Sequence, residues 1–299
     1  MKKVVIAWLL TFTLLLSVVG VASAITDGEL DNGRHPYVGI VAIFSDDGYE
    51  WRCSGTLISP TIFLTAGHCT EIYYDIVPTN AKIWFDDDVE SNSCPYIDGV
   101  GYEDCGDDKF PWGGWNEHFR TASNEYQLHT HPDYYDYPWF MHDLGVIVLD
   151  EPYYPGGYPG EFGILPQLDQ LDSMKTKRGK QDITFTAVGY GLQKSFPDAA
   201  SWKEVALKIR MVAYPKLIQI NTPGFTGDFS LLLSNNTATG GTCFGDSGGP
   251  NFIGDSNVIA GVTSFGMNPT CAGTGGVYRV DRADDLDWLA TFGVYPPTQ

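Results

Sequence analysis

A serine lies inside a run of small residues near the end of the chain, Gly245-Asp246-Ser247-Gly248-Gly249-Pro250. Glycines on both sides let backbone amides approach the serine closely, and they tolerate positive φ angles that other residues resist. A serine hydroxyl is a weak nucleophile and needs an adjacent base to accept its proton. The run therefore indicates a nucleophilic serine, with a structural glycine-rich turn as the alternative.

Two other segments supply the groups that such a serine needs. His68 follows an apolar run that is typical of a buried strand, and Asp143 opens the apolar run Leu144–Leu149. A carboxylate at the start of a core strand is costly unless it is paired, and it can hold a histidine in one tautomer. We therefore expect Ser247, His68 and Asp143 to act together. A core histidine and a strand-capping aspartate are the alternatives.

The first segment of the chain is typical of an export signal. Lys2 and Lys3 precede an apolar run over residues 4–21, and the small residues Ala22-Ser23-Ala24 follow it. This pattern predicts a secretory signal peptide over residues 1–24, with a retained membrane anchor as the alternative. We expect a secreted, extracellular protein that has no membrane association once the signal is removed.

The net charge and the cysteine content further narrow the functions and sites that the protein can have. The formal net charge of −19 argues against nucleic-acid binding, which needs a basic surface. Six cysteines in an exported chain predict disulfides, although the sequence alone leaves their pairing open. No two cysteines have the close spacing that is typical of zinc sites.

The remaining sequence predicts many short strands and one helix. A helical pattern is clear only at 283–292, and the Pro- and Gly-rich stretch 151–163 is the expected linker between two halves. This composition favours an all-β fold of sandwiches or barrels. Strands are expected at 38–44, 81–85, 144–149, 183–188 and 258–265.

Three motifs together resemble a known family. Thr65-Ala66-Gly67-His68-Cys69, Asp143-Leu144-Gly145-Val146 and the run around Ser247 are similar to the three signatures of the chymotrypsin/trypsin-like serine proteases. They also occur in that family's order, whereas subtilisins and α/β-hydrolases place the same groups in other orders. The resemblance extends to 53–58, 131–134, 188–191, 264–266 and 276–278.

The resemblance implies two Greek-key antiparallel β-barrels with a C-terminal α-helix. Residues 25–155 would form the N-terminal barrel with His68 and Asp143, and residues 156–299 the C-terminal barrel with Ser247 and the helix. The active site would lie in the cleft between them. Residues 86–120 form an acidic insert beyond what the family core needs.

The resemblance also implies the chemistry, which is peptide-bond hydrolysis by a serine endopeptidase through an acyl-enzyme. The catalytic residues would be Ser247, His68 and Asp143, with Ser264 bonded to Asp143. The backbone amides of Gly245 and Ser247 would form the oxyanion hole.

Activation and specificity follow by the same resemblance. A free amine on Ile25 would pair with buried Asp246, and a cut directly after Ala24 by signal peptidase would create that amine. Gly241, Ser264, Gly266 and Gly276 would surround the bound side chain. Because Gly241 carries no charge, large apolar or aromatic residues are expected on the acyl side of the cleaved bond.

The remaining expectations concern disulfides, ligands and partners. The family pattern pairs Cys53 with Cys69 and Cys243 with Cys271, which leaves Cys94 for Cys105. No cofactor or metal is expected, with calcium in the insert as the alternative to a solvated acidic face. The insert's tryptophans, Trp112 and Trp115, are expected to form a small core of its own.

We expect a monomer that acts on protein or peptide substrates. A non-catalytic binder and an esterase are the rival functions. Asn235-Asn236-Thr237 fits a glycosylation acceptor.

Overall fold

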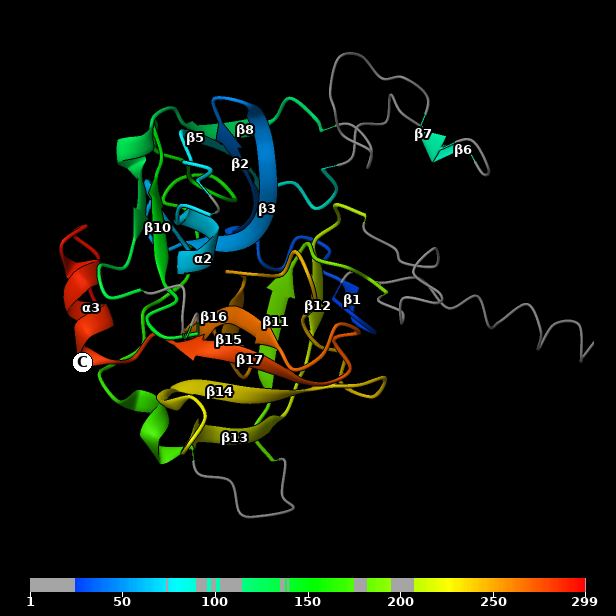
Figure 1. Cartoon of the computed structure of the whole chain (residues 1–299), viewed down its shortest axis with the longest axis vertical. Coiled ribbons are helices and arrows are strands. Elements are labelled where there is room, and N and C mark those ends of the chain that lie inside the picture. Colours follow the sequence, from blue (N-terminus) through cyan, green and yellow to red (C-terminus); the bar gives the residue numbers. More distant parts are fainter. Residues whose placement is uncertain are drawn as a thin grey trace, which may run out of the picture.

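Strands dominate the computed structural model of the chain. It describes residues 25–73, 75–89, 115–134, 138, 140–174, 182–194 and 207–298, together with the backbone of two short strands at 96–97 and 101–102. The strands form two curled, barrel-like sheets, and one helix follows them at the C-terminal end (Figure 1). The expected all-β class is confirmed. The expected signal peptide, 1–24, and the cysteines Cys94 and Cys105 lie outside the described residues.

The first sheet is built from the N-terminal half, and all its neighbouring strands are antiparallel. Its strand order is β8 (Phe119–Ala122), β5 (Asn80–Trp84), β2 (Val38–Ser45), β3 (Gly48–Leu57), β4 (Ile62–Thr65), β10 (Gly145–Val148) and β9 (Leu128–Thr130). Helix α2 (Gly67–Thr70) directly follows β4, and a 3₁₀ turn, η1 (Glu125–Gln127), precedes β9.

The second sheet is built mainly from the C-terminal half. Its strand order is β1 (Glu29–Leu30), β12 (Met211–Ala213), β11 (Phe185–Gly189), β15 (Pro250–Ile253), β16 (Ile259–Gly266), β17 (Gly273–Arg279), β14 (Gly227–Asn235) and β13 (Leu217–Thr222). Strand β1 comes from the start of the chain but pairs with β12, so the N-terminal segment is part of the second sheet.

The remaining elements are short. Strands β6 (Tyr96–Ile97) and β7 (Gly101–Tyr102) pair only with each other, and η2 (Gln170–Ser173) is a 3₁₀ turn. Helix α3 (Ala283–Ala290) starts where the sequence predicts, but it ends earlier than expected. The expected strands match β2, β5, β10, β11 and β16 to within a few residues at each end. Among the described residues, no helix is long and apolar enough to cross a membrane.

Strand β2 shows why the sequence folds into a strand here. Its side chains alternate between two apolar clusters because successive residues in a strand point to opposite faces. Val41 and Ile43 enter the main core, whereas Ile40 and Ala42 pack in a second cluster with Tyr190. Both faces of β2 are therefore buried, which explains its nearly continuous apolar sequence.

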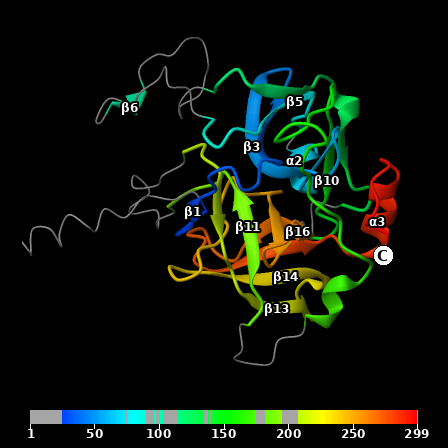
Figure 2. The same ribbon diagram turned by 180° about the vertical axis from the view of Figure 1, so that it is seen from behind.

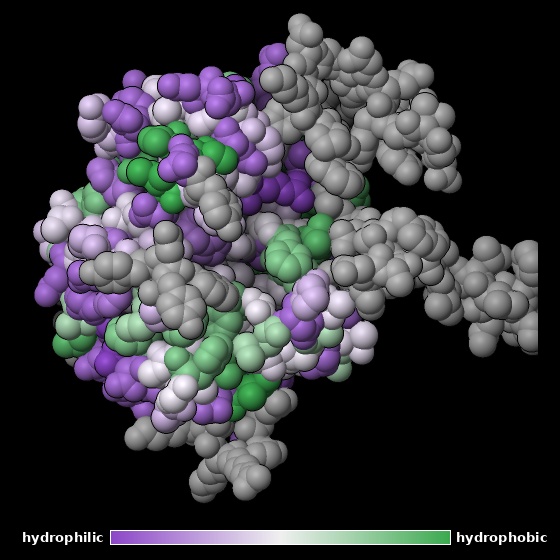
Figure 3. Space-filling model, in the orientation of Figure 1, coloured by the Kyte–Doolittle hydropathy of each residue, from purple (hydrophilic) through white to green (hydrophobic). Residues whose placement is uncertain are grey.

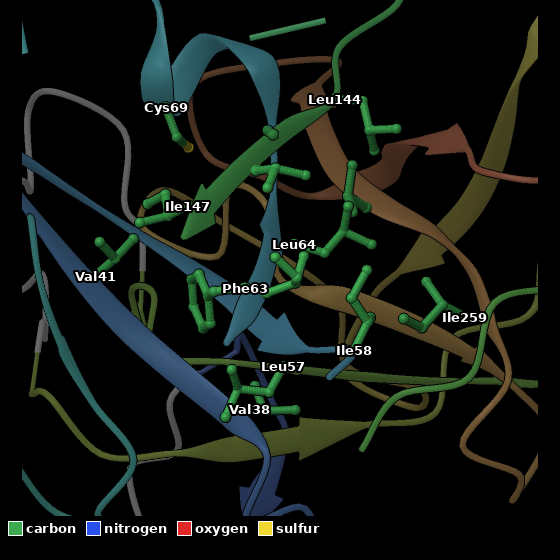
Figure 4. Packing of buried hydrophobic residues seen from close by; sticks show 14 of the residues in the cluster. Val38, Val41, Leu57, Ile58, Phe63, Leu64, Cys69, Leu144, Ile147 and Ile259 are labelled. Carbon is green, nitrogen blue, oxygen red and sulfur yellow. The ribbon is translucent and has the colours of Figure 1, made fainter. Parts of the chain in front are cut away.

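The main core continues from one sheet into the other. Ile58 follows β3 of the first sheet and Ile259 begins β16 of the second, and the two side chains lie next to each other in the same core cluster (Figure 4). Leu286 and Leu289 of α3 also belong to this cluster. Seen from behind, α3 lies at the edge of the molecule, beside the region where the two sheets meet (Figure 2). The sheets thus share one continuous apolar interior.

A buried arginine also joins the two sheets. Arg210, just before β12, donates to the carbonyl oxygens of Val38 (3.0 Å) and Phe85 (2.8 Å) of the first sheet. Its Nε donates to Asp31 at 2.9 Å, and its Nη1 donates to the hydroxyl of Tyr190 at 3.1 Å. A buried guanidinium is tolerated only when its donors are satisfied, so these contacts fix how the halves meet.

Candidate active site

The local fold around His68 is fixed by a disulfide and a tight contact. Strand β4 ends at Thr65, and α2 begins at Gly67. The Cys53–Cys69 disulfide joins α2 to β3, as expected. A Cβ at Gly67 would lie 3.0 Å from the backbone nitrogen of Leu144, so a glycine is needed where α2 packs against the Asp143 segment. The imidazole is thereby held beside the start of β10.

His68 is hydrogen-bonded to Asp143 by both its backbone and its ring. The distances from Nδ1 to the carboxylate oxygens are 2.9 Å and 3.1 Å, and the backbone N–H donates to Oδ1 at 2.9 Å. Asp143 is fully buried, and the Ser264 hydroxyl donates to its Oδ2 at 2.5 Å. An ionised carboxylate only accepts, so the ring proton belongs on Nδ1 and the Nε2 lone pair is available to accept.

This environment changes the proton affinity of His68. Burial lowers the pKa of the imidazole, but the negative charge and hydrogen bond of Asp143 outweigh burial and raise the pKa above its ordinary value. The side chain keeps 29% of its surface exposed, so a substrate can reach the ring. The imidazole is therefore placed to accept a proton and to be stabilised once it is charged.

The loop that carries Ser247 is pressed between the two sheets. The Ser54 N–H of β3 donates to the Ser247 carbonyl at 2.8 Å, and the Ser54 hydroxyl donates to the Gly245 carbonyl at 2.9 Å. The Gly248 N–H donates to the Thr263 carbonyl of β16 at 2.8 Å. Gly248 has φ +76°, and a Cβ there would lie 2.6 Å from the Ala66 nitrogen. The glycine is required because the loop lies directly against the backbone that leads to His68.

Ser247 itself is half-buried and makes few contacts. Within the described residues, its hydroxyl forms no hydrogen bond with His68, so the expected row of three bonded side chains is present only from His68 to Asp143 to Ser264. The backbone amides of Gly245 and Ser247 also donate to no acceptor within the described part of the chain. Two neighbouring unengaged N–H groups beside a serine are what an oxyanion site requires.

Asp246 is the second buried carboxylate of this region. Its oxygens accept from the backbone N–H groups of Gly191 (2.7 Å) and Cys243 (2.8 Å). Burial raises the pKa of this carboxyl to about 7, although the two backbone hydrogen bonds act in the opposite direction. A Cβ at Gly191 would lie 2.5 Å from the Asp246 Cγ, so the glycine leaves room for the carboxylate.

The expected partner of Asp246 is buried nearby in the second sheet. Ile25 is fully buried and packs with Ala187, Met211 and Ala213. Its nitrogen is a peptide amide in the intact chain, and no ion pair joins Ile25 to Asp246 among the described residues. The activation pair therefore stays a prediction.

Of the expected pocket residues, Ser264, Gly266 and Gly276 lie on the neighbouring strands β16 and β17, while Gly241 precedes the serine loop. The Cys243–Cys271 disulfide is present, as the family pattern implies. A Cβ at Gly241 would collide with the Asn235 side chain, and one at Gly276 would collide with the Phe265 ring. Gly266 is exposed, and the nearest atom to a Cβ there is 3.6 Å away. Asn235 and Phe265 thus border the positions that the sequence assigns to the pocket.

A cluster of ionisable side chains adjoins the loop before β10. His131, His142 and Asp285 offer polar atoms within 4.8 Å of one another. The His131 Nδ1 accepts the Asp133 N–H at 3.2 Å, so its ring proton belongs on Nε2, which faces Asp285 at 3.8 Å. Tyr278 donates to the Asp285 carboxylate at 2.9 Å. The Nε2 proton of His131 is therefore directed toward the Asp285 carboxylate.

Side chains of the acidic insert are described only at its two ends, while the backbone of β6 and β7 is described between them. Asp86 accepts from Asn116 at 3.0 Å, and Asp87 accepts from Arg210, so both carboxylates are engaged by protein donors. Trp115 stacks on Trp84 of β5 with ring centroids 4.3 Å apart and packs in the cluster that contains Ile40 of β2. The expectation that the insert's tryptophans form a core of its own is therefore wrong for Trp115, because its ring packs on the first sheet. Trp112 and the expected Cys94–Cys105 pair lie outside the described residues, and calcium binding by the insert stays a prediction.

Sequence reasoning missed two residues that hold the serine loop. Ser54 lies in a segment that carries only the general family resemblance, yet it bonds to the loop through both its backbone and its hydroxyl. The sequence around Asn235 indicates only a glycosylation acceptor, yet Asn235 is buried against Gly241. Neither stands in a pattern that the sequence distinguishes from ordinary strand residues.

Comparison with known proteins agrees with this geometry. A family model described as Trypsin matches residues 116–288. Glandular kallikrein from Sus scrofa is 23% identical and aligns over 87% of this chain and 92% of its own length. Coagulation factor XII from Cavia porcellus is 26% identical over 86% of this chain, which spans only 38% of that longer protein.

Solved structures show the same fold. HL collagenase superimposes with a TM-score of 0.62 at 21% identity, covering 90% of this chain and 98% of its own. Human heparin binding protein gives a TM-score of 0.59 at 16% identity, covering 92% of this chain and 100% of its own. Trypsin-like proteases act on protein or peptide substrates and need no cofactor. Because the family match spans more than half of the chain, the protein belongs to the trypsin family and is a serine endopeptidase.

Proposed function

We propose that the protein is an extracellular endopeptidase in which Ser247, His68 and Asp143 form the catalytic triad. The observation that carries the proposal is the hydrogen-bonded row from His68 through buried Asp143 to Ser264. Its members come from α2, the start of β10 and β16, so it crosses the junction of the two sheets. A buried carboxylate with these two partners orients the imidazole and stabilises its charged form.

The reaction follows from this orientation. Ser247 Oγ attacks the substrate carbonyl while its proton passes to His68 Nε2, and His68 then protonates the leaving amine. The amides of Gly245 and Ser247 hold the oxyanion, and loss of one such donor typically costs about 3 kcal/mol of transition-state stabilisation. A water molecule, activated by the same imidazole, releases the acyl group. Asp143 stays ionised throughout.

The proposal requires Ser247 to bond to His68 during the reaction. The serine is half-buried and its hydroxyl rotates about a single bond, while its backbone is fixed by Ser54. Nucleophile–base hydrogen bonds are often long or misaligned without substrate and shorten when substrate binds. We therefore expect the Ser247–His68 hydrogen bond to form when substrate binds.

For the acyl-side residue, we propose a preference for large apolar or aromatic side chains over basic ones. Gly241 offers no carboxylate to pair with lysine or arginine. Apolar side chains are exposed on both halves of the face in Figure 3, and exposed Phe225, Phe244 and Met267 lie on segments that adjoin the serine loop or β16. Digestion of a peptide library tests this preference, and dominant cleavage after basic residues would contradict it.

For activation, we propose that a free Ile25 amine pairs with Asp246. The carboxylate is buried among backbone donors and has a pKa of about 7 in the intact chain, so a cation beside it would favour its charged form. Export with cleavage after Ala24 would supply that amine and place the protein outside the cell, where its disulfides persist. N-terminal sequencing of the secreted protein tests this, and an active enzyme that begins at Ser23 would contradict it.

Covalent labelling tests the catalytic assignment directly. The protein secreted from an expression host is treated with a fluorophosphonate, and the labelled peptide is identified by mass spectrometry. We expect modification of Ser247 in the wild type and none in Ser247→Ala, with peptidase activity lost in parallel. An unlabelled wild type would favour a non-catalytic binder. Labelling with turnover of esters but not of peptides would favour an esterase.

A further inference from the structure

We propose that Thr26 and Asn235 form a clamp that positions the base of the substrate pocket by tying it to the N-terminal segment. The inference rests on the proposed function, and it adds two positioning residues to it. Both residues lie outside the triad, and they come from opposite ends of the chain. They meet on the segment Gly241–Thr242, which leads to the serine loop.

Asn235 is a buried polar side chain with both of its polar atoms engaged. It is the last residue of β14, and only 2% of its surface is exposed. Its Nδ2 donates to the Thr242 carbonyl at 2.7 Å, and its Oδ1 accepts from the Thr26 hydroxyl at 2.7 Å. A buried amide is stable only when both of its ends are paired. The amide nitrogen that would carry a glycan at this acceptor motif is bonded to the Thr242 carbonyl instead.

Thr26 holds the same segment from the other side. The Gly241 N–H donates to the Thr26 carbonyl at 3.0 Å, and the two residues form an isolated antiparallel bridge. Gly240 has φ +63°, and a Cβ there would lie 3.0 Å from the Thr26 carbonyl oxygen. The N-terminal segment therefore packs closely against the turn before Gly241.

The side chain of Asn235 occupies the space that any side chain at residue 241 would need. A Cβ at Gly241 would lie 2.5 Å from the Asn235 Oδ1 and 2.6 Å from its Cβ. The expected base of the pocket is thus closed by Asn235 rather than by residue 241. Asn235 is in turn held by Thr26. The shape of the pocket base therefore depends on the N-terminal segment being packed against the turn before Gly241.

The clamp is continuous with the serine loop. Thr242 precedes Cys243, which is tied to Cys271 by a disulfide and whose N–H donates to Asp246 at 2.8 Å. Asp246 directly precedes Ser247. Loss of the clamp should loosen the pocket base more than the reacting groups, because the Cys243–Cys271 disulfide and the bonds of Ser54 still hold the loop. The expected signature is therefore a raised KM with kcat nearly unchanged.

A double-mutant cycle on the full chain, expressed with its own leader and recovered from the medium, tests the clamp. The variants are Thr26→Val, Asn235→Ala and the pair, assayed on one peptide substrate. We expect each single variant to raise KM about tenfold, the cost of an unpaired buried polar group, and the pair to raise it hardly further. Thr26→Ser keeps the hydroxyl and should restore the wild-type KM.

Controls separate the possible failures. Asn236→Ala removes the adjacent, exposed asparagine, whose side chain bonds only to the Ala238 amide, and should leave KM within about twofold. An unchanged KM with a lower melting temperature, or strictly multiplicative effects in the cycle, would overturn the clamp. If Asn235→Ala is not secreted, Thr26→Val and Thr26→Ser still test the clamp, because Thr26 is only half-buried. An inactive wild type that does not react with the fluorophosphonate would instead refute the proposed function.

Discussion

The two buried aspartates beside the serine differ in what surrounds them. Asp143 is paired with an imidazole and a hydroxyl, which approach its oxygens to 2.9 Å and 2.5 Å. Among the described residues, Asp246 accepts hydrogen bonds from two backbone N–H groups. Burial raises its pKa to about 7, although these bonds and the charge of Arg52 act in the opposite direction. The first carboxylate therefore has its hydrogen-bonding partners in the folded chain, whereas the second forms no ion pair within the described residues.

This difference indicates that Asp143 and Asp246 have different tasks. A carboxylate that already has its partners can orient a base at all times, while a buried one without an ion-pair partner responds when a cation comes into contact with it. The side chain of Asp143 should therefore govern the chemical step, and that of Asp246 should govern whether the serine loop is in its working form.

The largest expected effect comes from Asp143→Asn. The amide would favour the wrong imidazole tautomer, and we expect kcat to fall about 10⁴-fold with little change in KM. Steady-state kinetics on a peptide substrate measure this, with the fluorophosphonate reaction rate as a second readout. A loss of less than about tenfold would show that Asp143 does not orient the base.

A smaller loss is expected for Asp246→Asn in the processed enzyme. Removing the charge strands a buried amine, so we expect kcat/KM to fall about a hundredfold. Active-site titration should show fewer competent molecules rather than a slower chemical step in each one. Equal activity of this variant and the wild type would refute the Ile25–Asp246 pair.

The pH dependence of kcat/KM should reflect the pairing of His68 with Asp143. The raised pKa of His68 predicts that kcat/KM rises with pH through a midpoint above the ordinary histidine value, because only the neutral ring accepts a proton. Below that midpoint the rate should change about tenfold per pH unit. A midpoint below the ordinary value would show that Asp143 does not stabilise the charged ring.

Ser264→Ala removes one of the two side-chain partners of Asp143. The backbone and ring of His68 remain bonded to the carboxylate, so we expect kcat to fall only about tenfold. Ser256→Ala, which removes an exposed hydroxyl, is the matched control and should be neutral. A loss as large as that of Asp143→Asn would mean that Ser264 has a further role in binding substrate.

The smallest effect concerns stability. In a chain that retains an extension before Ile25, the folded pKa of Asp246 is about 7 and lies above the unfolded value of 3.8. Its stabilising contribution is then present below pH 3.8 and is lost as the pH rises through about 7. Asp246→Asn should therefore melt a few degrees higher than the extended wild type at pH 8 but not at pH 4. A constant difference across this range would contradict the raised pKa.

The sequence predicts the reacting groups well because glycine and cysteine patterns mark them. The motifs around His68, Asp143 and Ser247 each require small neighbours for close packing, and the two described disulfides agree with the family pattern. The strands are equally readable because apolar runs are bounded by turn residues.

The supporting residues could not be predicted in the same way. Ser54 and Asn235 act through partners that are distant in sequence, and a serine or asparagine in a strand carries no local mark of such a role. The pairing of β1 with β12 is likewise invisible to a local pattern, because a strand of two residues has no periodicity. Its place in the second sheet depends on the tertiary fold alone.

The buried side chain of Arg210 has a consequence for the independence of the two halves. Its acceptors in the N-terminal half are Asp31, the carbonyls of Val38 in β2 and of Phe85 after β5, and Asp87, while Tyr190 after β11 is its acceptor in the C-terminal half. A fragment truncated at the linker would leave either a guanidinium without most of its acceptors or carboxylates and carbonyls without a donor. Neither half should therefore be soluble and ordered by itself, and limited proteolysis between them should yield a nicked complex that stays associated until it is denatured.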